Sequence, residues 1–227
     1  GDCHSLEVLA RPLSQHRRII APALLGFGGS PEPNRPWGAE DYAGVVRRWL
    51  EARGVERCDI LAHSFGGRIA IGLGAVYPET VGRLVLMAST GLTSPRSVRT
   101  RWNLLRAKVL KILARVVGNG LRSRIEARRE QLGSRDWRQA SPMMRKVLSR
   151  AVGENLAGLM EAIRAPTLLI YGENDRDTPP GLGRKMSRMI PGSEMMVVPG
   201  AGHYCFLDRT GDVLSAVWRH LGLPSAW

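Results

Sequence analysis

Residues 58–78 read CDILAHSFGGRIAIGLGAVYP, and this order of residue types predicts a β-strand, a sharp turn and an α-helix. Ser64 falls on the turn, which projects its hydroxyl clear of the backbone. Small residues two positions before and after it, here Ala62 and Gly66, let the strand and the helix pass each other closely. A glycine-rich turn with an ordinary N-cap serine is the competing interpretation.

Strand and helix patterns alternate on both sides of this turn. The expected strands are residues 18–21, 58–62, 83–88, 167–171 and 194–198. The expected helices are residues 39–53, 65–77, 182–189 and 210–221. Strands that alternate with helices form a mostly parallel sheet covered on both faces, so we expect an α/β fold.

One long segment, residues 91–164, interrupts this alternation. It contains no convincing strand pattern, and its apolar residues recur at helical spacing: Trp102, Leu105, Val109, Ile112, Leu113 and Val116. We interpret the segment as a helical lid between two strands and call it the insertion. The predicted organisation is therefore a first part of the core in 1–90, the insertion in 91–164 and a second part of the core in 165–227.

Composition limits the class of protein. The chain has 227 residues, of which 44% are hydrophobic, and this is enough for a core without disulfides or metals. The three cysteines, Cys3, Cys58 and Cys205, are too far apart to suggest a disulfide framework or a zinc site. We therefore expect the protein to be located in the reducing cytoplasm. No apolar run reaches the roughly 18 residues of a membrane-spanning helix, and residues 1–11 do not resemble a signal peptide.

Positive charge is concentrated in one part of the chain. The formal net charge is +13, and residues 92–150 hold 16 basic and 3 acidic residues, which accounts for the whole excess. A solvated lid surface is the simplest interpretation. Attraction of anionic substrates, or weak contact of a basic helical face (Lys108, Lys111 and Arg115) with anionic membranes, is the second. Nucleic-acid binding is not expected, because no recognition motif accompanies the charge.

Two further loops carry residues that could act with Ser64. Asp175 and Asp177 follow the expected strand 167–171, and His203 follows the expected strand 194–198. In a parallel sheet these loops and the Ser64 turn all lie at the carboxyl edge of the strands. A serine hydroxyl needs a base to take its proton, and the base needs an acid to orient it, so the three loops together predict a nucleophilic site.

The quoted motifs resemble the α/β-hydrolase family, in particular members with a lid inserted in the sheet. The matching stretches are APALLGFGGS at 21–30, HSFGG at 63–67, the segment Gly172 to Pro179, and GAGH at 200–203. The resemblance covers nearly the whole chain, and the insertion corresponds to the family's variable part. It implies a parallel sheet flanked by helices and a site that needs no metal or organic cofactor.

The resemblance also implies a role for each site residue. Ser64 corresponds to the nucleophile, His203 to the general base and Asp175 to the orienting acid, with Asp177 as the rival acid. The backbone N–H of Phe65, at the start of a helix, would stabilise a developing oxyanion.

A serine nucleophile is similar to that of esterases, lipases and C–C bond hydrolases. The expected reaction is hydrolysis of a carboxylic ester or related acyl bond of a small-molecule substrate, through an acyl-enzyme. The alternatives are a C–C bond hydrolase of ring-fission products and an inactive relative whose lid binds a ligand or a membrane.

The chain departs from the family pattern at its beginning. Family members have two or three strands before the first strand expected here, and the last of them leads into a His-Gly loop that donates a second oxyanion N–H. Residues 1–5 resemble the tail of that loop. We therefore expect either a fragment of a longer protein, which the intact Ser-Asp-His set favours, or a chain with compromised activity.

Overall fold

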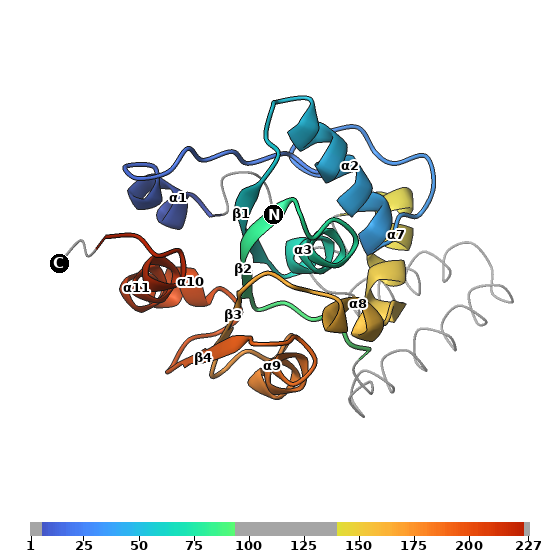
Figure 1. The fold of residues 1–227 in the computed structure, drawn as a ribbon. Coiled ribbons are helices and arrows are strands. Elements are labelled where there is room, and N and C mark those ends of the chain that lie inside the picture. Colours follow the sequence, from blue (N-terminus) through green and yellow to red (C-terminus); the bar gives the residue numbers. More distant parts are fainter. Residues whose placement is uncertain (1–5, 94–139, 225–227) are drawn as a thin grey trace, which may run out of the picture.

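The computed structural model describes residues 6–93 and 140–224. Within these ranges, four strands form one parallel sheet in the order β1-β2-β3-β4 (Figure 1). Their bounds are β1 (Cys58–His63), β2 (Val81–Met87), β3 (Thr167–Gly172) and β4 (Glu194–Val198). The structure confirms the predicted α/β class. The apolar stripe from Trp102 to Val116 and most of the basic excess lie outside the described residues.

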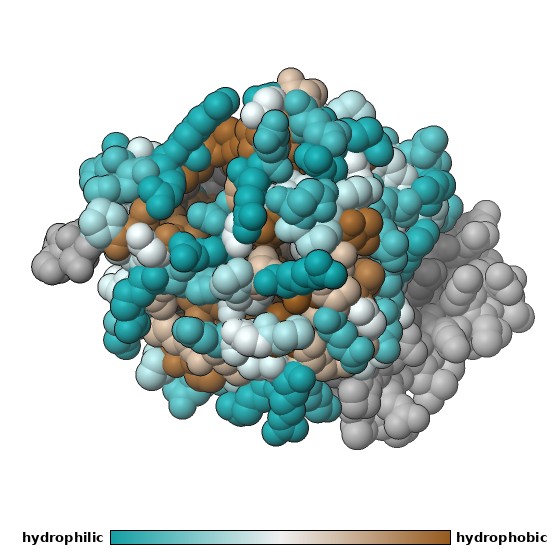
Figure 2. Space-filling view, in the orientation of Figure 1, coloured by the Kyte–Doolittle hydropathy of each residue, from teal (hydrophilic) through white to brown (hydrophobic). Residues whose placement is uncertain are grey.

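Eight helices are found in the described residues: α1 (Glu7–Leu13), α2 (Ala39–Glu51), α3 (Phe65–Val76), α7 (Pro142–Gly153), α8 (Ala157–Glu161), α9 (Pro180–Ser187), α10 (Cys205–Asp208) and α11 (Thr210–His220). Helices α7 and α8 belong to the insertion, whose boundaries stay a prediction. Within these residues, no helix has both the length and the apolar character that a membrane span requires. Hydrophilic residues cover most of the described surface on the face seen in Figure 2.

Helices cover the sheet on both faces (Figure 1). Leu84 and Leu86 of β2 belong to the core shared with α2, α3, α8 and α9. Val85 and Met87 belong to the core shared with α1, α10 and α11. Because consecutive residues in the second half of β2 are buried on opposite faces, residues 84–87 are continuously apolar rather than alternating.

A small residue sets the distance between α2 and α3. A methyl group added at Gly72 would lie 3.1 Å from the Ala39 carbonyl oxygen and 3.3 Å from the Ala43 Cβ. Contacts this short leave no room for a larger side chain. The many small residues of α3 therefore let α2 pack closely against the helix that follows Ser64.

Arg68 of α3 connects the residue before the insertion with a residue inside it. Its guanidinium donates to the Thr90 carbonyl at 2.7 Å and to the Glu154 carbonyl at 2.6 Å. The Glu154 carboxylate in turn accepts the Ala39 N–H at 3.1 Å. The first residue of the insertion also bonds to its later part, from the Leu156 N–H to the Gly91 carbonyl at 2.7 Å. The described part of the insertion is thus fixed to α2 and α3.

Three details differ from the sequence prediction. The prediction of a strand at 18–21 is wrong, because these residues have no regular secondary structure. In the described sheet β1 pairs only with β2, so residues 18–21 have no neighbouring strand with which to form a ladder. Helices α1 and α10 were not expected; α1 contains Pro12 and α10 has only 4 residues, so neither gives a strong periodic signal.

Gly172, the last residue of β3, gives a test of the packing between the loops after β3 and β4. An added methyl group would overlap the carbonyl oxygens of Ala201 and Gly202. We expect Gly172→Ala to lower the free energy of unfolding by about 1–3 kcal/mol, because the backbone must shift. Urea unfolding measures this change.

Gly181→Ala is the matched control, since nothing lies within 4 Å of a methyl group at that position. We expect it to be neutral or slightly stabilising, because alanine favours the helix. Equal destabilisation by both substitutions would contradict the assigned contact.

Candidate active site

The turn between β1 and α3 holds Ser64 in a strained backbone conformation. Its φ is 51° and its ψ is −116°, a region that non-glycine residues rarely occupy. The Ser64 N–H donates to the Met87 carbonyl at 3.0 Å, which extends the pairing of β1 with β2 into the turn. The sheet therefore holds the strained residue in place, as expected for a nucleophile elbow.

Crowding at this turn involves a different glycine from the one that the sequence indicates. A methyl group at Gly66 would meet only the Ala62 Cβ, at an ordinary 3.9 Å. A methyl group at Gly67 would overlap the Ser89 side chain, which follows β2. The residue with no room for a side chain is therefore Gly67, and its long-range contact leaves no local signal in the sequence.

His203 connects the other two predicted residues. Its Nε2 lies 3.2 Å from the Ser64 Oγ, and its Nδ1 lies 2.9 Å from the Asp175 Oδ2. Ser64 follows β1, Asp175 follows β3 and His203 follows β4, so all three lie at the carboxyl edge of the sheet. The structure brings together the three residues named from the sequence.

Asp175 is buried and has hydrogen-bond partners at both oxygens. Its Oδ1 accepts the backbone N–H groups of Asp177 at 2.8 Å and Thr178 at 2.9 Å. Its Oδ2 accepts the Thr178 hydroxyl at 2.6 Å and faces His203. Burial by itself would raise the pKa of the Asp175 carboxyl, but the bonds from His203 and Thr178 outweigh it and hold the pKa below its ordinary value.

Asp177, the rival acid, is exposed and supports Asp175 through its backbone. Asp175, Asp177 and His203 do place one potential metal ligand each within 4.8 Å of one another. However, both Asp175 oxygens already accept hydrogen bonds, and His203 Nδ1 is one of the partners. The arrangement therefore suits a proton relay better than a cation.

His63 supports the loop that carries His203. Its Nε2 lies 3.0 Å from the His203 carbonyl oxygen, and its ring packs against the rings of His203 and Phe206 at centroid distances of 4.8 and 5.0 Å. Burial lowers the pKa of His63 to about 4, so the ring is neutral at pH 7. Because a carbonyl only accepts, the Nε2 of the neutral ring carries the hydrogen.

Phe65 begins α3, and its N–H lies in the first turn, where no intrahelical acceptor exists. The helix dipole also favours negative charge at this end. The Phe65 ring packs against Phe27 at 5.2 Å and Tyr42 at 5.5 Å between centroids. Residues 1–5, which the sequence relates to the second oxyanion loop, lie outside the described residues.

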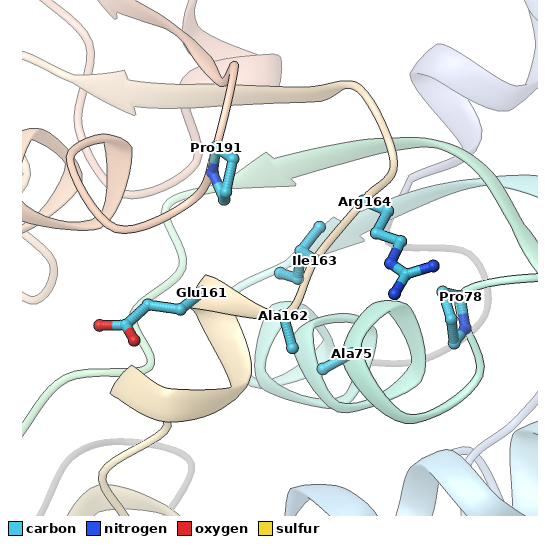
Figure 3. A pocket seen from close by; sticks show the side chains of 7 residues that line it. All are labelled: Ala75, Pro78, Glu161, Ala162, Ile163, Arg164 and Pro191. Atoms are coloured by element: carbon cyan, nitrogen blue, oxygen red, sulfur yellow. The ribbon is translucent and has the colours of Figure 1, made fainter.

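A hollow of about 540 Å³ lies elsewhere on the molecule (Figure 3). Its lining residues are Ala75, Pro78, Glu161, Ala162, Ile163, Arg164 and Pro191. Arg164 and Pro191 precede β3 and β4, so this hollow lies at the amino edge of the sheet, opposite Ser64. It is not part of the candidate site.

A parallel sheet with helices on both faces and a serine, a histidine and an aspartate at its carboxyl edge defines an α/β protein of the hydrolase class. The chain belongs to the α/β hydrolase family, whose model matches residues 2–217.

The similar proteins include hydrolases of two kinds. The chain is 33% identical over 216 residues to a 2-hydroxymuconate semialdehyde hydrolase of Pseudomonas putida, covering 86% of this chain and 74% of the relative. It is 26% identical over 220 residues to a pimeloyl-(acyl-carrier protein) methyl ester esterase of Neisseria meningitidis. This match covers 88% of this chain and 67% of the relative. A meta-cleavage product hydrolase of Pseudomonas fluorescens has a similar fold, with a TM-score of 0.70 and 20% identity. The superposition covers 97% of this chain and 85% of that structure.

The burial of His63 predicts a pH-dependent stability. Its pKa is about 4 in the folded chain against 6.5 for the free side chain, so the unfolded chain binds the proton first as the pH falls. This contribution is present above pH 6.5 and is lost as the pH falls toward 4. Relative to His63→Gln, the wild type should lose about 2 kcal/mol of unfolding free energy between pH 7 and pH 5.

Urea unfolding at the two pH values measures this difference. His16→Gln, which replaces an exposed histidine, serves as the control and should keep the wild-type pH dependence. A pH dependence of His63→Gln identical to that of the wild type would show that His63 does not contribute it.

Proposed function

We propose that this chain is a serine hydrolase that cleaves a carboxylic ester or related acyl bond. The observation that carries the proposal is the continuous hydrogen-bonded series Ser64–His203–Asp175, with distances of 3.2 and 2.9 Å. Membership of a hydrolase family supports the same conclusion. A histidine that faces a serine on one side and a buried carboxylate on the other can accept the serine proton and share the resulting charge.

In the first half of the reaction, His203 Nε2 takes the proton from the Ser64 hydroxyl as the oxygen attacks the substrate carbonyl. The carbonyl π electrons move to its oxygen, and the Phe65 N–H donates a hydrogen bond to that oxyanion. The tetrahedral intermediate then collapses, the bond to the leaving oxygen breaks, and His203 gives its proton to the leaving group. The product is an alcohol and an acyl-enzyme on Ser64.

The second half repeats these steps with water. His203 takes a proton from water, the hydroxide attacks the acyl carbonyl, and the proton passes to the Ser64 oxygen as the acid leaves. Asp175 keeps the hydrogen of the neutral imidazole on Nδ1, so that Nε2 is free to act as a base. Its negative charge also stabilises the imidazolium that forms in each half.

An apolar cluster next to the Ser64 turn supports an apolar acyl group as substrate. Met144 and Val147 of α7 pack with Tyr42 and Ile69 in one buried cluster, and the partly buried rings of Phe27 and Phe65 lie against it. Since Phe65 is the residue after Ser64, this cluster lies beside the turn that carries the candidate nucleophile. Hydrophobic lining with a few polar groups is typical of small-molecule sites.

A second candidate is hydrolysis of a C–C bond next to a carbonyl. The observation that favours it is the 33% identity to the 2-hydroxymuconate semialdehyde hydrolase. The same Ser64, His203 and Asp175 would serve this reaction. Parallel kcat/KM measurements on 2-hydroxymuconate semialdehyde and on p-nitrophenyl esters decide between the candidates, and we expect the higher value for an ester.

Ser64→Ala tests the proposed nucleophile. We expect hydrolysis of short p-nitrophenyl esters to fall by at least about 10³-fold, because the alanine has no oxygen to attack the carbonyl. The matched control is Ser193→Ala, which removes a serine hydroxyl bonded to Ser187, before β4 and at the opposite edge of the sheet. It should keep wild-type turnover. Undiminished turnover by folded Ser64→Ala would refute the proposal.

A further inference from the structure

Thr178 places one hydroxyl within reach of three groups at the candidate site. Its Oγ1 lies 2.6 Å from Asp175 Oδ2, 3.0 Å from the Ala88 carbonyl oxygen and 3.4 Å from His203 Nδ1. The Thr178 side chain is buried, and it is the third residue after Asp175 in the loop that follows β3.

The hydroxyl has only one hydrogen, whereas two of its neighbours can only accept. The Ala88 carbonyl and the Asp175 carboxylate therefore compete for it. A charged acceptor forms the shorter and stronger bond. The carboxylate oxygen lies 2.6 Å from the hydroxyl oxygen, whereas the Ala88 carbonyl oxygen lies 3.0 Å from it. The hydrogen belongs on the Asp175 side.

This assignment completes the hydrogen bonding of Asp175. Two backbone N–H groups bond to Oδ1, while the Thr178 hydroxyl and the His203 ring bond to Oδ2. A carboxylate has about four lone-pair positions, so all of them are in use. Thr178 and His203 then donate to the same oxygen, and each hydrogen bond weakens the other.

We propose that Thr178 is a positioning residue that weakens the hydrogen bond between Asp175 and His203 by donating its hydroxyl to the same carboxylate oxygen. The inference rests on the proposed function for its catalytic consequence, but the geometry stands without it. Because the carboxylate charge is shared between two donors, Asp175 stabilises the protonated form of His203 less than it would without Thr178. His203 then stays neutral, and able to act as a base, to lower pH.

Other titratable groups also face His203. His63 approaches from β1, Asp177 lies in the same loop as Asp175, and the Tyr204 ring packs against the His203 ring at 5.4 Å between centroids. Asp208 of α10 accepts the Gly202 N–H, next to His203, at 2.7 Å. A substitution at Thr178 leaves these groups in place. A change in the titration of His203 in the variant can therefore be assigned to the hydroxyl.

The test is Thr178→Val, which removes the hydroxyl and nearly conserves shape. We expect the titration midpoint of His203, followed by NMR of its ring, to rise by about half a unit to one unit. The acidic limb of the pH profile of kcat/KM should move to higher pH by the same amount. Thr178→Ser restores the hydroxyl and should return both to the wild-type values.

The control is Thr167→Val at the amino end of β3. Thr167 is also buried, and its hydroxyl donates to the Ala165 carbonyl at 2.8 Å, so this variant loses a comparable bond far from His203. It should lower stability without moving the His203 midpoint. Thr178→Ala removes the same hydroxyl with a smaller side chain and gives the measurement if the valine variant does not fold.

The sign of the shift decides the outcome. A downward shift would mean that the hydroxyl donates to Ala88 and accepts from His203, and an unchanged midpoint would mean that Thr178 only fills space; either overturns the inference. The NMR titration needs no turnover. A shifted midpoint without ester hydrolysis would refute the proposed function alone, and hydrolysis with an unshifted midpoint would refute this inference alone.

Discussion

Parallel pairing of the four described strands is the constraint on which the candidate site depends. All neighbouring strands run in the same direction, so the loops after β1, β3 and β4 emerge at one edge of the sheet. Ser64 and His203 are 139 positions apart in the sequence, and this edge brings them within hydrogen-bond distance. The parallel pairing of the strands thus fixes the geometry of the polar site.

The cost of burying a charge connects this edge to the stability of the fold. A buried carboxylate is unfavourable unless its oxygens are bonded, and removing one partner of such a group typically costs about 3–5 kcal/mol. Asp175 avoids this penalty through its own loop and through His203. His63 in turn fixes the backbone of His203 from β1. The loops after β1, β3 and β4 therefore support one another, and a change in one is expected to affect the others.

The sequence predicted the sheet well because its strands are short apolar runs bounded by turn residues. It failed for residues 18–21, whose apolar pattern meets no neighbouring strand in the described sheet. The three residues of the site were predictable because each follows a strand at the same edge. The preference for Asp175 over Asp177 followed from a resemblance. In the structure Asp175 is buried and faces His203, whereas Asp177 is exposed. The crowding at Gly67 and the bond from Thr178 depend on contacts that local patterns do not record.

The central claim is that Ser64 is the nucleophile activated by His203 and Asp175. The most direct measurement is mass spectrometry of peptides from the chain after reaction with a fluorophosphonate, which bonds covalently to activated serines. The account predicts a single adduct on the peptide that contains Ser64, with labelling that is lost in His203→Ala. An adduct on another serine, or no adduct on the folded chain, would contradict it.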